Sequence, residues 1–380
     1  MKRNWWLFGI AVVAIVLFAL VFSQRKAGER EVIKIGAILP LTGDAAVYGE
    51  HAQNGFEIAL EEYNAHGVCG GKRIKILYED SQADPSKAVS AFKKLVEIDK
   101  VRFILGPLSS SEVLAIAPLA NRRKVIVLTP LASAPAITEA GDYIFRNVMS
   151  DLFDGAAIAT YVIKEMHKKT AGILYINNDF GVGLKNSFKE KFEELGGVVK
   201  VEIPFERGEK DFRSLLLKLK RANPDVVFLV GYKEMAEILR QTKEMGLKFQ
   251  FVSFSMFEDP DILRLAGDAA EGVVYTYRAF DPKSENPVVK EFVQKYTTKY
   301  GEEPDIFAAL SYDGARILFN ALDRGNCDVE GVKEALYNTK DFPGVVGKTT
   351  FDHNGDVIKP IGIKIVKNGK FVWLTKHFRV

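Results

Sequence analysis

From residue 32 onward, the chain alternates between two patterns of apolar and polar positions. Short and almost continuously apolar runs, such as those at 32–39 and 101–105, alternate with longer segments that have apolar residues at helical spacing, such as 52–64 and 85–98. Apolar strands separated by helices indicate parallel sheets that are covered on both faces. The pattern therefore predicts an α/β protein.

The alternation falls into two blocks, divided near residues 147–151. The first is predicted to contain strands at 32–39, 73–80, 101–105 and 125–128 and helices at 52–64, 85–98 and 111–121. The second is predicted to contain strands at 171–176, 198–203, 225–230 and 250–254 and helices at 151–168, 182–195, 211–221 and 233–245. Helices at 287–300, 306–322 and 329–337 follow, and then an antiparallel segment with turns at Asn354-Gly355 and Asn368-Gly369. We expect two Rossmann-like lobes with parallel sheets, and a chain that returns to both of them.

Residues 1–31 have a different pattern from the rest. Lys2 and Arg3 precede an uncharged apolar run at 5–22, and a polar stretch follows. Such a segment is either a secretory signal or an uncleaved membrane anchor. A buried core helix is disfavoured because the run is not amphipathic, and the one small-residue cleavage pattern, ending at Ser23, is weak. Both remaining interpretations predict an extracytoplasmic protein, in the periplasm or on the outer face of the cytoplasmic membrane.

The charge balance argues against a nucleic-acid partner. Residues 1–31 contain five basic and two acidic side chains, so the 52 basic and 49 acidic residues of the whole chain become 47 of each beyond residue 31. A neutral body has no basic surface to neutralise phosphates. Nucleic-acid binding is therefore not expected.

Metal and enzyme chemistry have little support in the sequence. Cys69 and Cys327 are the only cysteines, and they are compatible with either a disulfide or two free thiols. The five histidines are scattered without ligand spacing, so we expect no metal site. Glycine-rich nucleotide loops and nucleophile elbows are absent, and no histidine follows a strand near Ser109. We expect neither a cofactor nor an enzyme.

Two serine-bearing loops follow neighbouring strands of the first block. Ser109 and Ser110 open a helix after the strand at 101–105, and Ser133 follows the strand at 125–128. Ligands of open parallel sheets bind beyond the carboxyl ends of the strands. Hydroxyl groups and the free N–H groups of a helix start suit a carboxylate or phosphate. A helix cap is the competing interpretation of one serine run, but two such loops favour an anion site.

Three further residues face this anion site in the predicted arrangement. Asp151 lies at the division between the blocks, where it either caps the next helix or meets a ligand ammonium group. Phe180 and Tyr232 follow strands of the second block, so we expect them to contact an apolar or aromatic ligand side chain.

Several motifs, in this order, resemble the type I periplasmic binding proteins, specifically the leucine/isoleucine/valine-binding family. The resemblance runs from Ile33 to the C-terminus and rests on "GPLSSSEV", "TPLASAP", "FRNVMSD", "NDFGVGL", "GEKDFRSLLLKLK", "GYKEMAEILRQ" and "FDHNGDV". It implies three hinge crossovers, near 147–151, 277–281 and 358–361. It also implies a first lobe of residues 32–148 plus 280–358 and a second of 149–279 plus 359–380.

The resemblance also implies roles for individual residues. Ser109 and Ser133, with backbone groups near Leu131, match the family's carboxylate site, and Asp151 matches its ammonium-binding aspartate. The aromatic positions match Tyr48, Phe180 and Tyr232. The full set of expected ligand-binding residues is Tyr48, Ser109, Ser110, Leu131, Ala132, Ser133, Asp151, Phe180, Tyr232, Ser255 and Glu258.

One position departs from the family pattern. Branched-chain amino-acid binders place a glutamate after the strand that corresponds to 250–254, whereas this chain has Ser255 or Met256 there and Glu258 slightly later. Either Glu258 reaches the ligand or the ammonium group has one partner fewer. An unpaired buried charge is costly, so the second case would favour an aromatic carboxylate or a small amide as ligand.

The resemblance thus predicts an exported solute-binding receptor of an ABC uptake system, with an apolar amino acid as ligand. Its partner would be a membrane permease, and its soluble part is expected to be monomeric. A sensor ectodomain of the same fold is the rival hypothesis.

Overall fold

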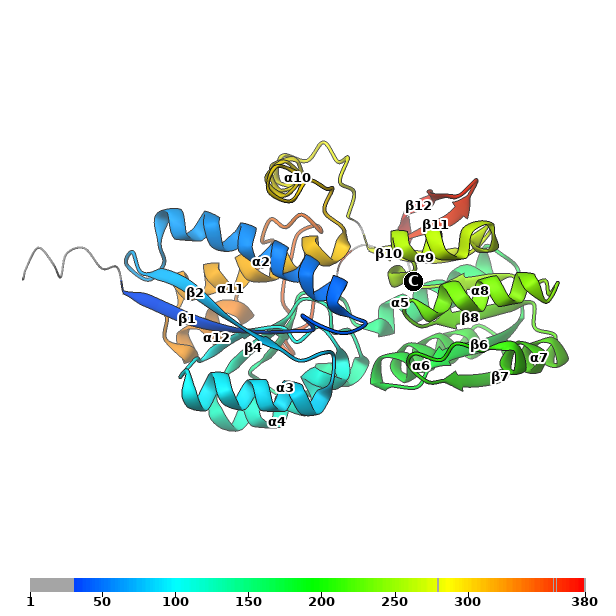
Figure 1. The fold of residues 1–380 in the computed structure, drawn as a ribbon, viewed down its shortest axis with the longest axis horizontal. Coiled ribbons are helices and arrows are strands. Elements are labelled where there is room, and N and C mark those ends of the chain that lie inside the picture. Colours follow the sequence, from blue (N-terminus) through cyan, green and yellow to red (C-terminus); the bar gives the residue numbers. More distant parts are fainter. Residues whose placement is uncertain (1–30, 279, 358, 360, 379–380) are drawn as a thin grey trace, which may run out of the picture.

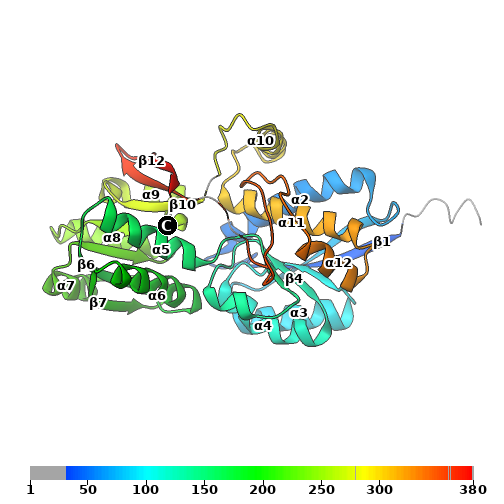
Figure 2. The ribbon, with the colours of Figure 1, turned by 180° about the vertical axis from the view of Figure 1, so that it is seen from behind.

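The computed structural model describes residues 31–278, 280–357, 359 and 361–378. Within them, two sheets lie end to end along the long axis of the molecule, each with helices on both faces (Figures 1 and 2). The predicted α/β class with parallel sheets in two lobes is confirmed. The expected signal or anchor at 1–31 lies outside the described residues, apart from Glu31.

Lobe 1 contains a five-stranded parallel sheet with the order β2-β1-β3-β4-β5. Its strands are β1 (Val32–Leu39), β2 (Arg73–Asp80), β3 (Phe103–Leu105), β4 (Ile126–Thr129) and β5 (Ile144–Arg146). One face is covered by α2 (Ala46–His66), α10 (Pro287–Tyr300), α11 (Ile306–Arg324) and α12 (Val329–Tyr337). The other is covered by α3 (Pro85–Lys93), the π-helical turn Lys94–Ile98, α4 (Ser110–Arg123) and the 3-10 turn Pro135–Glu139.

Lobe 2 contains a seven-stranded sheet with the order β12-β11-β10-β9-β8-β6-β7. Its strands are β6 (Thr170–Ile176), β7 (Val198–Phe205), β8 (Val226–Val230), β9 (Phe251–Ser253), β10 (Val274–Arg278), β11 (Ile361–Lys367) and β12 (Lys370–Phe378). Its helices are α5 (Asp151–Lys164), α6 (Asp179–Glu194), α7 (Arg213–Ala222), α8 (Glu234–Glu244), α9 (Pro260–Ala266) and the 3-10 turns Ser255–Phe257 and Gly267–Ala270. The pairs β10–β11 and β11–β12 are antiparallel, and the other pairs are parallel.

The chain passes between the lobes three times: from β5 to α5, from β10 to α10, and from Val357 to β11 (Figure 1). These crossings agree with the three crossovers of the predicted fold. The exact lobe boundaries at 148, 279 and 358 stay a prediction, because residues 279 and 358 are not among those described.

Two glycines of α2, which begins six residues before its apolar pattern predicts, approach neighbouring backbone closely. A Cβ atom on Gly49 would lie 2.0 Å from the carbonyl oxygen of Pro40, so a glycine is required where the first turn of α2 contacts the end of β1. A Cβ atom on Gly55 would lie 2.3 Å from the carbonyl oxygen of Ala308, where α2 packs on α11. The first of these contacts lies in residues 46–51, the part of α2 that its apolar pattern does not predict.

Several local features were not predicted correctly. Helix α9 was missed, and strands β5 and β10 were missed because no helix was predicted between either of them and the strand before it. The turn at Asn368-Gly369 joins β11 to β12 as predicted, but the turn at Asn354-Gly355 closes only an isolated bridge between Phe351 and Val357.

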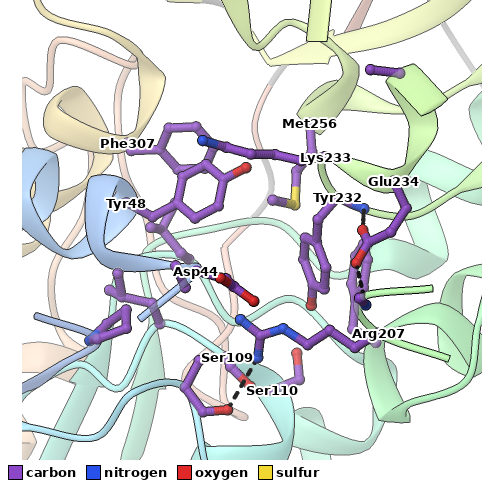
Figure 3. Close-up of a pocket in the computed structure, with 18 of the residues that line it drawn as sticks. Asp44, Tyr48, Ser109, Ser110, Arg207, Tyr232, Lys233, Glu234, Met256 and Phe307 are labelled. Atoms are coloured by element: carbon purple, nitrogen blue, oxygen red, sulfur yellow. Dashed lines mark hydrogen bonds between the residues drawn. The ribbon is translucent and has the colours of Figure 1, made fainter. Parts of the chain in front are cut away.

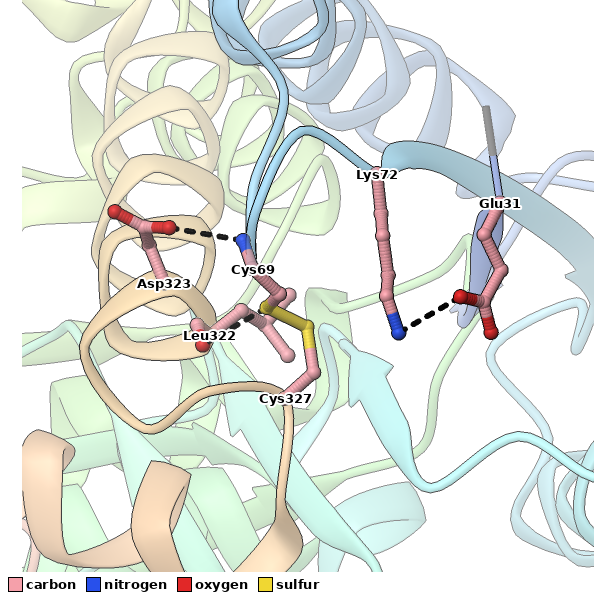
Figure 4. The surroundings of a disulfide bond; sticks show 6 residues. All are labelled: Glu31, Cys69, Lys72, Leu322, Asp323 and Cys327. Atoms are coloured by element: carbon pink, nitrogen blue, oxygen red, sulfur yellow. Dashed lines mark hydrogen bonds and ion pairs between the residues drawn. A yellow bond between two sulfur atoms is a disulfide. The ribbon is translucent and has the colours of Figure 1, made fainter. Parts of the chain in front are cut away.

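The structure decides between the two interpretations of the cysteines. Cys69 and Cys327 form a disulfide with a Cα–Cα distance of 6.0 Å, and it joins positions that are 258 residues apart in the sequence (Figure 4). The N–H group of Cys69 donates to the carboxylate of Asp323 at 2.8 Å, which ties the loop after α2 to the end of α11. The bond therefore joins the early and late segments of lobe 1.

Candidate functional site

A cavity of about 680 Å³ lies between the lobes, beyond the carboxyl ends of their strands. Eight of the eleven predicted residues line it: Tyr48, Ser109, Ser110, Leu131, Ser133, Phe180, Tyr232 and Ser255. Figure 3 shows the serines on one side and the aromatic rings of Tyr48, Phe307 and Tyr232 around the space above them. The cavity has the size and mixed lining of a small-molecule site.

A hydrogen bond joins the two serine loops: the N–H group of Ala134 donates to the hydroxyl of Ser110 at 3.1 Å. Within the second loop, the N–H group of Ala132 donates to the hydroxyl of Thr129 at 3.1 Å. Ala132 is buried and does not line the cavity, so its predicted direct contact with ligand is not supported by this geometry. Ser110 shares its hydroxyl between the cavity and the neighbouring loop.

A buried arginine fixes the second loop from behind. The Arg146 Nη1 atom donates to the carbonyl oxygens of Ser133 at 3.2 Å and Ala134 at 2.9 Å. The same guanidinium forms a two-point ion pair with Asp356, in the segment before the third crossing. Arg146 is fully buried and Asp356 is partly buried, and their bidentate pair is of the strong, geometrically specific kind. It determines where Ser133 faces the cavity.

Glu112 lies directly under the first serine loop. It is fully buried, lines the cavity, and accepts the Ser109 N–H group at 3.3 Å through Oε2. Its Oε1 atom has no hydrogen-bond partner within the described part of the chain. Burial raises the pKa of Glu112, and the charge of Arg207 acts in the opposite direction.

Lobe 2 contributes an aromatic wall. The rings of Phe180 and Tyr232 stack with centroids 5.5 Å apart at 22°, and Phe254 lies 5.3 Å from Phe180. Burial raises the pKa of the Tyr232 phenol to about 12, so this side chain stays neutral at ordinary pH. Phe180 belongs to the first turn of α6 and not to a loop, but it faces the cavity as predicted.

Tyr48 approaches from lobe 1 and contacts lobe 2. Its ring lies 4.8 Å from that of Phe307, and its hydroxyl donates to the Asp259 carboxylate at 3.1 Å across the cleft. Burial, followed by the charge of Asp259, raises the pKa of Tyr48. A second contact between the lobes runs from the hydroxyl of Ser111 to Asp179 at 2.7 Å. The lobes are thus in contact on two sides of the cavity.

The two carboxylates expected near an ammonium group do not line the cavity. Asp151 is fully buried beside Ser133, whose carbonyl accepts the Asp151 N–H group at 2.9 Å. It is close enough to Tyr232 for its charge to add to the effect of burial on the phenol pKa. Asp151 therefore lies behind the cavity wall, next to the predicted carboxylate site.

Glu258 was expected among the ligand-binding residues, but it does not line the cavity. Its carboxylate accepts from the hydroxyl of Tyr275 at 2.6 Å and from the ammonium of Lys364 at 2.5 Å. Lys364 in turn lies 3.7 Å from the ring centre of Tyr277 and 4.5 Å from that of Trp373. Glu258 points into lobe 2 because a buried lysine on β11, 106 residues later, offers it a charge partner there.

Ser255 lines the cavity as predicted and links it to the interior of lobe 2. Its hydroxyl donates to Asp154 at 3.3 Å, and the hydroxyl of Thr276 donates to the same carboxylate at 2.6 Å. This buried network fixes the end of β9 relative to α5.

Sequence reasoning missed several lining residues. Arg207 follows the end of β7 and Asp44 follows β1, so position after a strand could have identified both. Phe307 lies in the first turn of α11 and reaches the cavity only because this helix returns to lobe 1, which no local pattern indicates. Figure 3 shows Asp44 and Arg207 pointing toward one another from opposite lobes.

Neither a metal-binding cluster nor a membrane span emerges from the described residues. Groups of three or more potential ligands among histidine, cysteine, aspartate and glutamate do not occur there. Over the same residues, every helix is too short or too polar to cross a bilayer.

Comparison with known proteins adds the following. A family model described as "Periplasmic binding protein" matches residues 32–370. The leucine-, isoleucine-, valine-, threonine- and alanine-binding protein of Pseudomonas aeruginosa is 32% identical over 352 residues, which cover 91% of each chain. A leucine-binding protein structure from Thermotoga maritima has 34% identity and a TM-score of 0.84, and the match covers 90% of this chain and 97% of that one. A solute-binding protein of an ABC transporter from Rhodopseudomonas palustris, in complex with 3,4-dihydroxybenzoic acid, has 27% identity and a TM-score of 0.81 over 92% and 98% of the chains.

Proposed function

Since the chain belongs to the periplasmic binding protein family, we propose that it is an exported receptor that binds an apolar α-amino acid between its lobes. Proteins of this family bind small solutes outside the cytoplasm for an ABC permease and are not enzymes. The observation that carries the proposal is the cavity, which combines two serine loops at one end with an aromatic wall at the other.

The serine end supports binding of a carboxylate. Ser109 precedes α4, whose first N–H groups and positive dipole end point toward the cavity, and Ser133 lies on the adjacent loop. Such an arrangement attracts an anion and donates hydrogen bonds to it. The buried Arg146 contacts support a site that exists before the ligand arrives.

The aromatic end supports an apolar ligand side chain. Tyr48 and Phe307 from lobe 1 face Phe180, Tyr232 and Met256 from lobe 2, so a side chain there would be enclosed from both sides. Enclosure of this kind needs both lobes, and ligand would therefore favour the closed state through a population shift.

A second candidate is a carboxylate ligand without an α-amino group. It is favoured by one observation: Glu258 is paired with Lys364, and Asp151 lies behind the cavity wall. Under this alternative the two carboxylates are structural and the aromatic wall stacks on an aromatic acid. The relative in complex with 3,4-dihydroxybenzoic acid has the same fold. A sensor ectodomain remains the alternative to a transport receptor.

We further propose that the protein works as a monomer and that residues 1–31 either direct its export or anchor it in the membrane. The permease would recognise the closed form.

The test compares three ligands with one carbon skeleton. L-Leucine, 4-methylpentanoate and L-leucinol differ only in the ammonium and carboxylate groups, and thermal unfolding of the exported protein with each of them reports binding. A ligand at a thousand times its dissociation constant stabilises the folded state by about 4 kcal/mol. Stabilisation by L-leucine alone would support the amino-acid receptor.

The other outcomes separate the candidates. Equal stabilisation by L-leucine and 4-methylpentanoate, or by aromatic acids only, would support the second candidate. Stabilisation by L-leucinol as strong as that by L-leucine would contradict a carboxylate site.

A further inference from the structure

The lobe 1 half of the carboxylate site contains a negative charge that opposes its expected ligand. The start of α4 contributes about half a positive charge, whereas the buried Glu112 contributes a full negative one when ionised. Ser109 and Ser133 are neutral. When Glu112 is ionised, it repels an incoming carboxylate unless a cation from elsewhere reaches the site.

Four basic side chains line the cavity, and their contacts differ. Lys233 is ion-paired with Asp261 at 3.0 Å, and Arg240 is paired with Glu237. Lys210 and Arg207 have no ion pair among the described residues. Of these two, Arg207 reaches lobe 1: its Nη1 atom donates to the carbonyl oxygen of Ala83 at 3.3 Å.

The loop after β7 places the Arg207 guanidinium at the serine end of the cavity. Figure 3 shows the guanidinium next to Asp44 and Ser109, on the side of the cavity away from the ring of Phe307. It lies 5.9 Å from the ring centre of Tyr232, and its charge acts on Glu112. The loop itself is fixed by Glu234, which accepts the N–H group of Gly208 at 2.9 Å.

We propose that Arg207 completes the carboxylate site from lobe 2, binding the ligand carboxylate opposite Ser109 and Ser133 and offsetting the charge of Glu112. A guanidinium has five N–H donors, so one bond to Ala83 leaves others for a carboxylate. This role rests on the proposed function, in which lobe 1 takes the carboxylate. It also narrows the ligand class to carboxylates, because an amide or an alcohol would gain nothing from the cation.

The proposed role of Arg207 also links the charge of the ligand to closure of the two lobes. Lobe 1 holds Glu112 and the serines, and lobe 2 holds Arg207, so the three meet only when the lobes come together. A carboxylate between them would draw the lobes toward one another.

The experiment measures the affinity of the exported protein for L-leucine and 4-methylpentanoate by calorimetry, with the variants Arg207→Gln, Arg207→Lys and Glu112→Gln. We expect Arg207→Gln to weaken the better of the two ligands by roughly 10- to 100-fold, the size of a charge-assisted hydrogen bond. Arg207→Lys should retain part of the affinity, since it keeps the charge without the planar donors.

The double variant Glu112→Gln/Arg207→Gln distinguishes a ligand contact from a simple bridge between the lobes. Removing the charge of Glu112 should restore at least about fivefold of the lost affinity, because the repulsion that Arg207 offsets is gone. Glutamine can keep the hydrogen bond to the Ser109 N–H group. The control is Ser111→Ala, which breaks the Ser111–Asp179 bond between the lobes outside the cavity and should cost less than threefold.

The proposal is overturned if Arg207→Gln binds within threefold of the wild type. It is also overturned if Arg207→Gln and Ser111→Ala weaken binding equally and Glu112→Gln restores nothing, which would make Arg207 a bridge between the lobes only. Failure of the wild type to bind either ligand would instead contradict the proposed function, on which the role of Arg207 rests.

Discussion

The two lobes present their cavity-facing groups in different ways. In lobe 1, Ser133 is fixed by buried bonds from Arg146, which is itself paired with Asp356 at the third crossing. In lobe 2, the rings of Phe180 and Tyr232 stack on one another, and Glu234 accepts the N–H groups of Tyr232 and of Gly208, next to Arg207. The serine half is thus held from behind by a buried guanidinium, and the half that covers the ligand is held by ring contacts and single hydrogen bonds.

The difference between the lobes indicates that they act at different steps of binding. Fixed donors suit recognition of a carboxylate, whose geometry is the same in every amino acid. Aromatic rings suit ligand side chains of varied shape, and the rings and Arg207 of lobe 2 contact the ligand only when the lobes meet. We therefore expect lobe 1 to capture the solute and lobe 2 to close over it.

The largest effect should come from breaking the buried ion pair of lobe 1. Arg146→Leu leaves the Asp356 carboxylate and two loop carbonyls without their donor. Loss of one partner of a buried pair costs about 3–5 kcal/mol. We expect a fall of that size in the free energy of unfolding by urea, together with loss of L-leucine binding. Unchanged affinity in a destabilised Arg146→Leu protein would show that this contact does not position Ser133.

The disulfide should stabilise lobe 1 more than lobe 2, because both of its cysteines belong to lobe 1. Cys69→Ser/Cys327→Ser should lower the free energy of unfolding by about 2–4 kcal/mol, since the bond closes a long loop of the unfolded chain. Urea unfolding measured with a reporter in each lobe checks this. Reductant should destabilise the wild type and leave the double variant unchanged, and an equal effect of reductant on both would contradict the prediction.

Removal of a single serine hydroxyl should weaken binding. Ser133→Ala should leave the fold unchanged, whereas Ser109→Ala also removes the N-cap of α4 and should cost about 1 kcal/mol of stability. In the proposed carboxylate site, Ser109→Ala and Ser133→Ala would each delete a hydrogen bond to the ligand, so we expect about 1–2 kcal/mol of lost affinity for L-leucine. Calorimetry measures the affinity, and thermal unfolding without ligand provides the control. An unchanged dissociation constant in both variants would contradict the carboxylate site.

In lobe 2, a substitution of Glu258 tests whether this carboxylate contacts the ligand. Because its carboxylate is bound to Lys364 and Tyr275, Glu258→Gln should leave the L-leucine dissociation constant within about threefold of the wild type. Its unfolding free energy should fall, since the buried ammonium of Lys364 loses its counter-charge. A tenfold loss of affinity with unchanged stability would mean that Glu258 reaches the ligand after all.

The smallest effect concerns His51, on α2. Its hydrogen bond to Asp305, the N-cap of α11, is the main cause of a raised pKa. A raised pKa in the folded state stabilises the protein fully below the unfolded value near 6.5, and the contribution disappears as the pH rises through the folded value. We expect less than about 1 kcal/mol for this partly exposed pair. Urea unfolding across that pH range should show the trend in the wild type and not in His51→Gln.

Most of the fold could be predicted from the sequence, because its strands are buried on both faces and therefore nearly continuous in apolar residues. Val226–Val230 and Ile126–Thr129 are examples. β5 and β10 were missed because no helix was predicted between either of them and the strand before it, and the start of α2 has no apolar pattern.

The candidate site could be predicted where a residue follows directly after a strand. Ser109, Ser133 and Tyr232 all do, and the structure brings them to one cavity. The place of Glu258 could not be decided from the sequence because its partner Lys364 is distant in it. Phe307 was missed for the same reason, since its place depends on how α11 packs against lobe 1.

The most direct test of capture by lobe 1 and closure by lobe 2 is small-angle X-ray scattering of the exported protein with and without saturating L-leucine. We predict that the radius of gyration falls on addition of L-leucine, and that Ser109→Ala/Ser133→Ala shows no fall at the same concentration. An unchanged radius in a wild-type protein that calorimetry shows to be saturated would contradict closure of the two lobes over the ligand.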